Sequence, residues 1–361
     1  EAAAAQKVNT LSPTSIIFYD YSMSKLTPKE KTRLELMADL IKSGPKDRVY
    51  KIEGHAEYHV DALGNLIVFK KGKKPANHKV MLDAHMDEVG FIITGITPEG
   101  FLRFTKVGGI DTRVALGRAV KVGEHGISGV LGVKPIHLLD KKEEAVMPKD
   151  DDLYIDIGAE SREEAEKYVS LGDSAWFDSA EFEMGDGFIK SKALDDRAGC
   201  AALIEMIRGE LEYDAWFSFS VQEEIGLRGA GVAAFGIAPE YAIVVETTTA
   251  ADISGVKGEK RVCVCGEGGA VSFMDRSTLY GRELYNKAFE VADKYGIPCQ
   301  TKTLVAGGND AGAIHKSRGG VKVLTVSVPC RYLHSPSCVI KYSDAENSLK
   351  LIKALAAELA K

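Results

Sequence analysis

The chain has 361 residues, of which 45% are hydrophobic and 27% are charged, a balance typical of a globular protein with a full core. Its net charge is −6 and its basic clusters are short, so nucleic acid is not expected as a partner. No apolar run is long enough to cross a bilayer, so we expect no membrane partner either.

The six cysteines show no CxxC spacing and no dense framework, which favours reduced thiols in a cytoplasmic protein. Cys263 and Cys265 are predicted to share one face of a strand, with a metal site as the less favoured interpretation. Residues 1–5 have the character of a processed or artificially extended end, and they are excluded from the fold interpretation.

In chain order, the first predicted element is a helix over residues 28–43, where apolar residues recur at helical spacing. Short strands are expected at 58–60 and 66–69, on either side of a turn at 61–65. The apolar run at 78–86 is typical of a buried strand.

Residues 91–181 have a different pattern, in which short β-rich pieces are separated by Gly, Pro and charged turns. This pattern predicts a small β-barrel or β-sandwich. One short helix is expected to begin at Ser161, because Glu164 three residues later completes a capping-box signature.

After residue 187, predicted strands and helices alternate. They comprise a helix from about 195, strands at 215–222 and 241–245, a helix at 276–296, a strand at 321–328 and a helix at 343–360. The alternation predicts an α/β fold with a mostly parallel sheet covered by helices on both faces. The α/β domain then comprises residues 1–90 and 182–361, with residues 91–181 inserted into it.

Acidic and histidine side chains follow the predicted strands, and ligands of open α/β sheets bind at the carboxyl ends of strands. The residues expected at this rim are His85, Asp87, Glu223, Glu224, Glu246 and His334, together with Asp195 and Asp196 at a helix start. Each residue alone has an ordinary structural explanation. Asp195 and Asp196, for example, could simply cap the helix.

The combination of these residues favours a pair of divalent metal ions. Several carboxylates at one sheet edge repel each other strongly unless a cation compensates their charge. Each ion would take one histidine and one or more carboxylates, while one carboxylate bridges the two ions. A spare carboxylate must then act as general base. The adjacent Glu223 and Glu224 supply one ligand and one base.

Seven segments are similar, in content and order, to the tetrahedral (TET-type) metallo-aminopeptidases, which include bacterial glutamyl and archaeal deblocking aminopeptidases. The segments are DALGNLI (61–67), AHMDEVGFIIT (84–94), KALDDRAGC (192–200), VQEEIGLRGA (221–230), VVETTTAADISG (244–255), GGNDAGAIH (307–315) and CRYLHSPSCVI (330–340). The resemblance therefore extends from about residue 60 to the C-terminus.

The resemblance implies an aminopeptidase with two divalent ions, zinc or cobalt, in a zinc-peptidase-like domain. The implied ligands are His85, Asp195, Glu224, Glu246 and His334. His85 and Glu246 belong to one ion, and Glu224 and His334 to the other. Asp195 resembles the bridging carboxylate.

The same resemblance assigns supporting roles. Glu223 resembles the general base, and Asp87 resembles the residue that orients His85. The peptide bond between Asp195 and Asp196 is expected to be cis.

Two departures from the family pattern concern the site: many members carry Asp where this chain has Glu246, and Thr where it has Asn309. Asn309 and Asp310 are implied to lie near the substrate. The insert at 91–181 corresponds to the family's subunit-assembly domain. The family's typical particle is a hollow homododecamer that admits short peptides.

An N-acyl-amino-acid deacylase or a carboxypeptidase is the main alternative, because either would use the same metal site. Some relatives are described as glycanases, but no paired acid and base carboxylates stand outside the metal cluster. A non-enzymatic binding protein is disfavoured, because every expected ligand and the base are present.

Overall fold

The computed structural model describes residues 56–361. The helix predicted over 28–43 lies outside the described residues. The strands predicted at 58–60 and 66–69 are confirmed as an antiparallel hairpin. Its turn forms because one carboxylate oxygen of Asp61 accepts hydrogen bonds from the backbone N–H groups of Leu63, Gly64 and Asn65.

The described residues form one mixed sheet of eleven strands. Its main path is β1 (Ala56–Val60), β2 (Leu66–Lys70), β12 (Ala215–Ser220), β3 (Val80–His85), β13 (Tyr241–Thr249), β16 (Lys322–Arg331), β17 (Cys338–Lys341), β11 (Phe188–Ser191) and β10 (Phe182–Met184). Two short strands, β14 (Gly269–Val271) and β15 (Cys299–Thr301), extend from β16 off this path.

Parallel pairing is restricted to the centre of this sheet and to the β14–β15 pair. Strands β12, β3, β13 and β16 run parallel to one another, and their residues are almost all buried. The outer strands on both sides pair antiparallel. The expectation of a mostly parallel sheet is therefore correct for the centre and wrong for the margins, where short hairpins replace helical crossovers.

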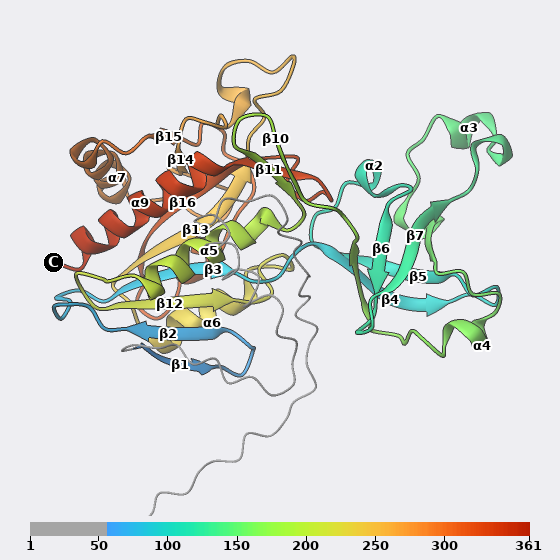
Figure 1. Cartoon of the computed structure of the whole chain (residues 1–361), viewed down its shortest axis with the longest axis horizontal. Coiled ribbons are helices and arrows are strands. Elements are labelled where there is room, and N and C mark those ends of the chain that lie inside the picture. Colours follow the sequence, from blue (N-terminus) through green and yellow to red (C-terminus); the bar gives the residue numbers. More distant parts are fainter. Residues whose placement is uncertain (1–55) are drawn as a thin grey trace, which may run out of the picture. The chain divides into compact units, whose positions relative to one another are not determined.

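Two helix pairs pack on the central strands. The helices of ten or more residues are α5 (Leu194–Arg208), α6 (Arg228–Ile237), α7 (Arg282–Tyr295) and α9 (Tyr342–Leu359). In Figure 1, α5 and α9 cross in front of the strands, and they pack on each other and on β13. Helix α6 packs on β12 and β3 and contacts the short α8 (Ala311–Ile314), which reaches β13 and β16. No helix within 56–361 is long and apolar enough to cross a membrane.

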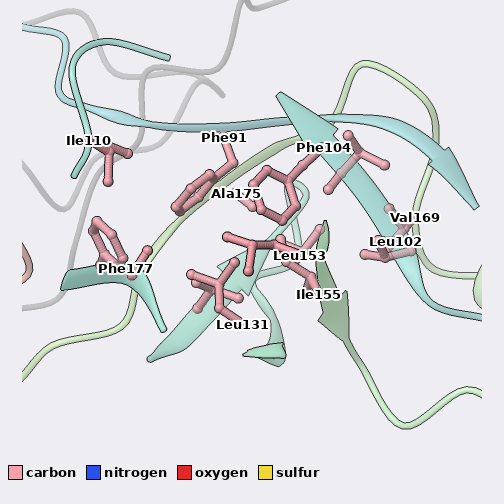
Figure 2. Close-up of a cluster of buried hydrophobic side chains, with 14 of the residues drawn as sticks. Phe91, Leu102, Phe104, Ile110, Leu131, Leu153, Ile155, Val169, Ala175 and Phe177 are labelled. Atoms are coloured by element: carbon pink, nitrogen blue, oxygen red, sulfur yellow. The ribbon is translucent and has the colours of Figure 1, made fainter. Parts of the chain in front are cut away.

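Residues 90–177 contain a closed six-stranded barrel, the first of the two β-architectures expected for this region. Its strand order is β4 (Gly90–Ile96), β5 (Leu102–Val107), β8 (Leu153–Asp156), β7 (Ile127–Val133), β6 (Ala119–Val122) and β9 (Ser174–Phe177). Figure 2 shows its core, where Phe91 packs edge-on against Phe104 and Phe177 with ring centroids 4.9 and 5.4 Å apart. Closure removes the exposed sheet edges that an isolated insert would otherwise present.

The helix predicted from Ser161 is confirmed as α4 (Arg162–Ala165), whose Glu164 N–H donates to the Ser161 side chain. The sequence interpretation missed the other short helices of this region. These are α2 (Thr112–Ala115) and α3 (Lys141–Glu144), with 3₁₀ turns η1 (Ile136–Leu138) and η2 (Asp150–Asp152). Helices of three or four residues are too short to produce an apolar period.

Two further expectations in the α/β part need correction. Helix α7 begins at Arg282 rather than 276, because Asp275 forms a tight turn by accepting hydrogen bonds from the N–H groups of Ser277 and Thr278. Cys263 and Cys265 lie in a loop between η3 (Gly258–Arg261) and β14, not on a strand. All six cysteines are free, and the thiols of this pair donate to different backbone carbonyls.

Candidate metal centre

The fold brings the predicted metal ligands together at the carboxyl edge of the parallel strands. His85 is the last residue of β3, and Glu223 and Glu224 follow β12. Glu246 lies within β13 rather than after it, because that strand continues to Thr249. His334 lies in the loop between β16 and β17.

His85 is the centre of the first group of donors. Its Nε2 atom lies 3.2 Å from Asp195 Oδ1 and 3.4 Å from Glu246 Oε1. His85 is buried with 2% of its side chain exposed, and Asp195 and Glu246 are each 8% exposed. One ligand atom from each of His85, Asp196 and Glu246 lies within 4.8 Å of the others, a separation that suits a bound ion.

His334 is the centre of the second group. Its Nε2 atom lies 3.1 Å from Asp195 Oδ2 and 3.4 Å from Glu224 Oε2. Ligand atoms of Asp195 and Glu224 also lie within 4.8 Å of each other and of His85, which is the centre of the first group. Asp195 therefore directs one carboxylate oxygen to each histidine.

The start of α5 presents this carboxylate. Asp195 and Asp196 have non-helical backbone angles although they stand within the helix bounds, and the peptide bond between them is cis, as the resemblance implied. Asp196 was expected at this rim, but the resemblance gave it no role beyond that bond. The structure also places its carboxylate among the possible donors, and the one available signal was its adjacency to Asp195.

Asp87 supports both groups from one position. Its backbone carbonyl accepts a hydrogen bond from His85 Nδ1 at 3.0 Å, which leaves Nε2 free to bind a metal. Its two carboxylate oxygens accept from the backbone N–H groups of Glu223 and Glu224, each at 3.1 Å. Asp87 therefore ties the end of β3 to the loop after β12.

Asp87→Ala is expected to weaken metal binding by about 10–100-fold, the usual cost of losing an outer partner of a metal ligand. The reason is that the backbone N–H groups of Glu223 and Glu224 lose their acceptor, which releases the loop that carries these residues. Metal titration by calorimetry measures the effect. Asp61→Ala, which releases a turn on the β1–β2 hairpin, is the matched control and should leave metal affinity unchanged.

Several carboxyl groups are buried close together in this cluster, and the pKa values of its three glutamates are raised. Burial, with repulsion from Glu246, Asp310 and Glu224, raises the pKa of Glu223 to about 10. Burial, with repulsion from Asp195, raises the pKa of Glu224 and of Glu246 to about 8. Although burial opposes it, hydrogen bonding to Asp195 raises the pKa of His334 to about 9.

The donor set fits divalent cations. Carboxylate oxygens and imidazole nitrogens suit zinc and related ions. The buried atoms Glu224 Oε1 and Asp196 Oδ2 have no hydrogen-bond partner. A buried carboxylate oxygen without a partner is costly, and a bound cation would compensate both oxygens.

Asn309 and Asp310 are not among the possible metal donors. Both are buried, with 3% and 1% of their surface exposed. The Asn309 side chain is hydrogen bonded to Tyr280 and Thr325, and Asp310 accepts from the Ser220 hydroxyl at 2.6 Å. These internal partners do not support direct contact of either side chain with a substrate.

A histidine and carboxylate cluster on an α/β sheet, with a barrel in the same chain, defines a candidate metallohydrolase. The model of the M42 glutamyl aminopeptidase family matches residues 64–351. The chain belongs to this family of metal-dependent peptidases, and the resemblance inferred from its sequence is confirmed.

Individual relatives agree with this assignment. A lysyl aminopeptidase of Pyrococcus furiosus is 36% identical over 312 residues, which cover 84% of this chain and 87% of that protein. The TET1 peptidase of Pyrococcus horikoshii, described as assembling into a tetrahedron or a large octahedral shell, is 40% identical with a TM-score of 0.75, over 92% of this chain and 94% of that one. An aminopeptidase of the archaeon Desulfurococcus kamchatkensis is 33% identical with a TM-score of 0.80, over 91% and 90%.

Proposed function

We propose that the chain is a dinuclear aminopeptidase in which His85 and Glu246 hold one divalent ion and His334 and Glu224 hold the other. The observation that carries the proposal is Asp195, whose two oxygens lie 3.2 and 3.1 Å from the Nε2 atoms of the two histidines. A carboxylate in this position can bridge two ions. Bound zinc or cobalt ions would polarise the scissile carbonyl and acidify a water molecule.

Glu223 is proposed as the general base. Its Oε2 atom stays 4.0 Å from His85 Nε2, whereas Glu224 Oε2 approaches His334 Nε2 to 3.4 Å. Glu223 is also more exposed than Glu224, at 11% against 3% of the side chain. Bound cations would oppose the raised pKa of Glu223. The ionised Glu223 carboxylate could then take a proton from the attacking water and pass it to the leaving amine, while Glu224 remains a ligand.

Hydrolysis of aminoacyl-nitroanilides by chelator-stripped protein tests this function. Zinc, cobalt or manganese is added back separately, and N-acyl-amino acids and peptides with blocked N-termini are assayed in parallel. Metal-dependent release from free N-termini alone supports the proposal. Preferential hydrolysis of the N-acyl substrates would indicate a deacylase, and release of C-terminal residues would indicate a carboxypeptidase.

We also propose that residues 91–181 form an assembly domain inserted between residues 1–90 and 182–361, and that the chain forms a homododecamer. Large apolar side chains are exposed on β7 and in the segment that connects it to β8, at Val130, Ile136, Leu138, Val146 and Met147. Several large apolar side chains exposed in one segment are typical of a protein interface. The described assembly of the Pyrococcus horikoshii relative supports the same interpretation. The two helix pairs on the sheet support coverage of both its faces.

Ile136→Asp together with Leu138→Asp is expected to shift the chain from a large particle to small oligomers, because two charges would be buried in the interface. Light scattering after size exclusion measures the particle mass. Val60→Asp, at an exposed apolar residue of β1, is the matched control. An unchanged particle mass in the double variant would place the interface elsewhere.

A further inference from the structure

The loop between β5 and α2 reaches from the barrel strands to the second group of donors. The carbonyl oxygen of Gly109 lies 3.2 Å from His334 Nδ1 and accepts its hydrogen. Donation from Nδ1 makes Nε2 the free nitrogen, and Nε2 is the atom that lies 3.1 Å from Asp195. Gly109 therefore does for His334 what the Asp87 carbonyl does for His85.

The neighbouring residue, Gly108, lies against Glu224, the other proposed ligand in the group of His334. A Cβ atom at Gly108 would lie 2.9 Å from Glu224 Oε2 and 2.7 Å from Val89 Cγ1. Its backbone φ of +75° also favours glycine over residues with a side chain. The absence of a side chain at Gly108 therefore leaves Glu224 in reach of His334.

The contacts of Gly108 and Gly109 involve the proposed ligands of only one of the two ions. The loop meets both His334 and Glu224, which would share an ion. By contrast, His85 Nδ1 is held by the Asp87 carbonyl and Glu246 Oε1 accepts from the Thr247 N–H, partners that lie outside the barrel strands. A change in the loop should thus affect the two ions unequally.

We propose that the Gly108–Gly109 loop is a positioning element of the metal centre: the Gly109 carbonyl fixes the tautomer and orientation of His334, and Gly108 leaves room for Glu224. The barrel then completes the site as well as serving assembly. This inference rests on the proposed two-ion function.

Gly108→Ala is expected to weaken binding of one metal equivalent by about 10–100-fold and to leave the other unchanged. Gly117→Ala is the matched control, because Gly117 has a similar φ of +70° but a Cβ there would meet no atom within 4 Å. Metal content after dialysis, with cobalt absorption spectra and a thermal melt, separates loss of one ion from unfolding. Two tightly bound equivalents in a folded Gly108→Ala variant would overturn the role of Gly108.

The wild-type protein provides a direct test that needs no loop variant. Nitrogen-15 NMR of the zinc-loaded, histidine-labelled chain, with the His334 signal identified by its loss in His334→Gln, reports which ring nitrogen carries the proton. A proton on Nδ1 is expected, and a proton on Nε2 would overturn the inference. If the wild-type protein binds fewer than two ions, the proposed function fails first. If it binds two and only the loop results disagree, only this inference fails.

Discussion

Glu223→Gln is expected to lower kcat by about 10²–10⁴-fold, the usual contribution of general acid–base catalysis, while both metal equivalents remain bound. Glutamine keeps the size of the side chain but cannot accept and return a proton. The predicted separation of roles follows from the contacts, since Glu223 Oε2 is 4.0 Å from the nearest imidazole nitrogen. Steady-state kinetics and metal analysis on the same samples measure the two quantities.

The neighbouring Glu224→Gln is the matched control for this prediction. It makes the same chemical change one residue away, but it removes a carboxylate whose Oε2 atom lies 3.4 Å from His334 Nε2. We expect this variant to lose one metal equivalent together with activity. A Glu223→Gln variant that also lost metal would show that the two glutamates are not divided into base and ligand.

Asp195→Asn is expected to weaken both metal equivalents and to abolish measurable turnover. Its two oxygens face the two histidines, so one substitution removes negative charge from both proposed ion sites. Loss of a residue that only supports a metal ligand lowers affinity by about 10–100-fold. The loss of affinity in Asp195→Asn should be larger, because a proposed ligand itself is changed. Equilibrium dialysis against zinc measures the affinity of each equivalent.

The control for Asp195→Asn is another carboxylate with buried contacts and no donor role. Asp344 accepts hydrogen bonds from the backbone N–H groups of Gly266 and Gly268 and is not among the possible metal donors. Asp344→Asn should lower the melting temperature and still bind two ions. If Asp195→Asn retained one tight equivalent, Asp195 would belong to a single ion rather than bridge two.

The sequence alone identified the residue types of the site, because a site for divalent metal ions requires carboxylate and imidazole ligands. Carboxylates and histidines stood after apolar runs, and apolar runs form the buried parallel strands β3, β12 and β13. Strand ends of a parallel centre meet at one edge, so the proximity of His85 to the carboxylates could be expected without coordinates. The family motifs extended that expectation to His334 and the cis peptide.

Tertiary structure decided the features that depend on contacts between distant segments. The antiparallel margin formed by β17, β11 and β10 consists of strands of three or four residues, which are too short for periodicity to reveal. Asn309 and Asp310 are buried and form hydrogen bonds with Tyr280 and Ser220, respectively. These partners are distant in the sequence, so residue spacing could not predict them.

Two residues in the site, Asp196 and Gly109, show the same difference between what the sequence predicts and what only the tertiary structure reveals. Asp196 was expected at this edge of the sheet, but only the folded structure brings its carboxylate close to His85 and Glu246. Gly109 contributes a backbone carbonyl, which every residue possesses, so nothing in its identity marks it as a partner of His334. Residue identity therefore determined which side chains could bind metal, and the packing of the barrel loop against His334 and Glu224 decided how those side chains are held.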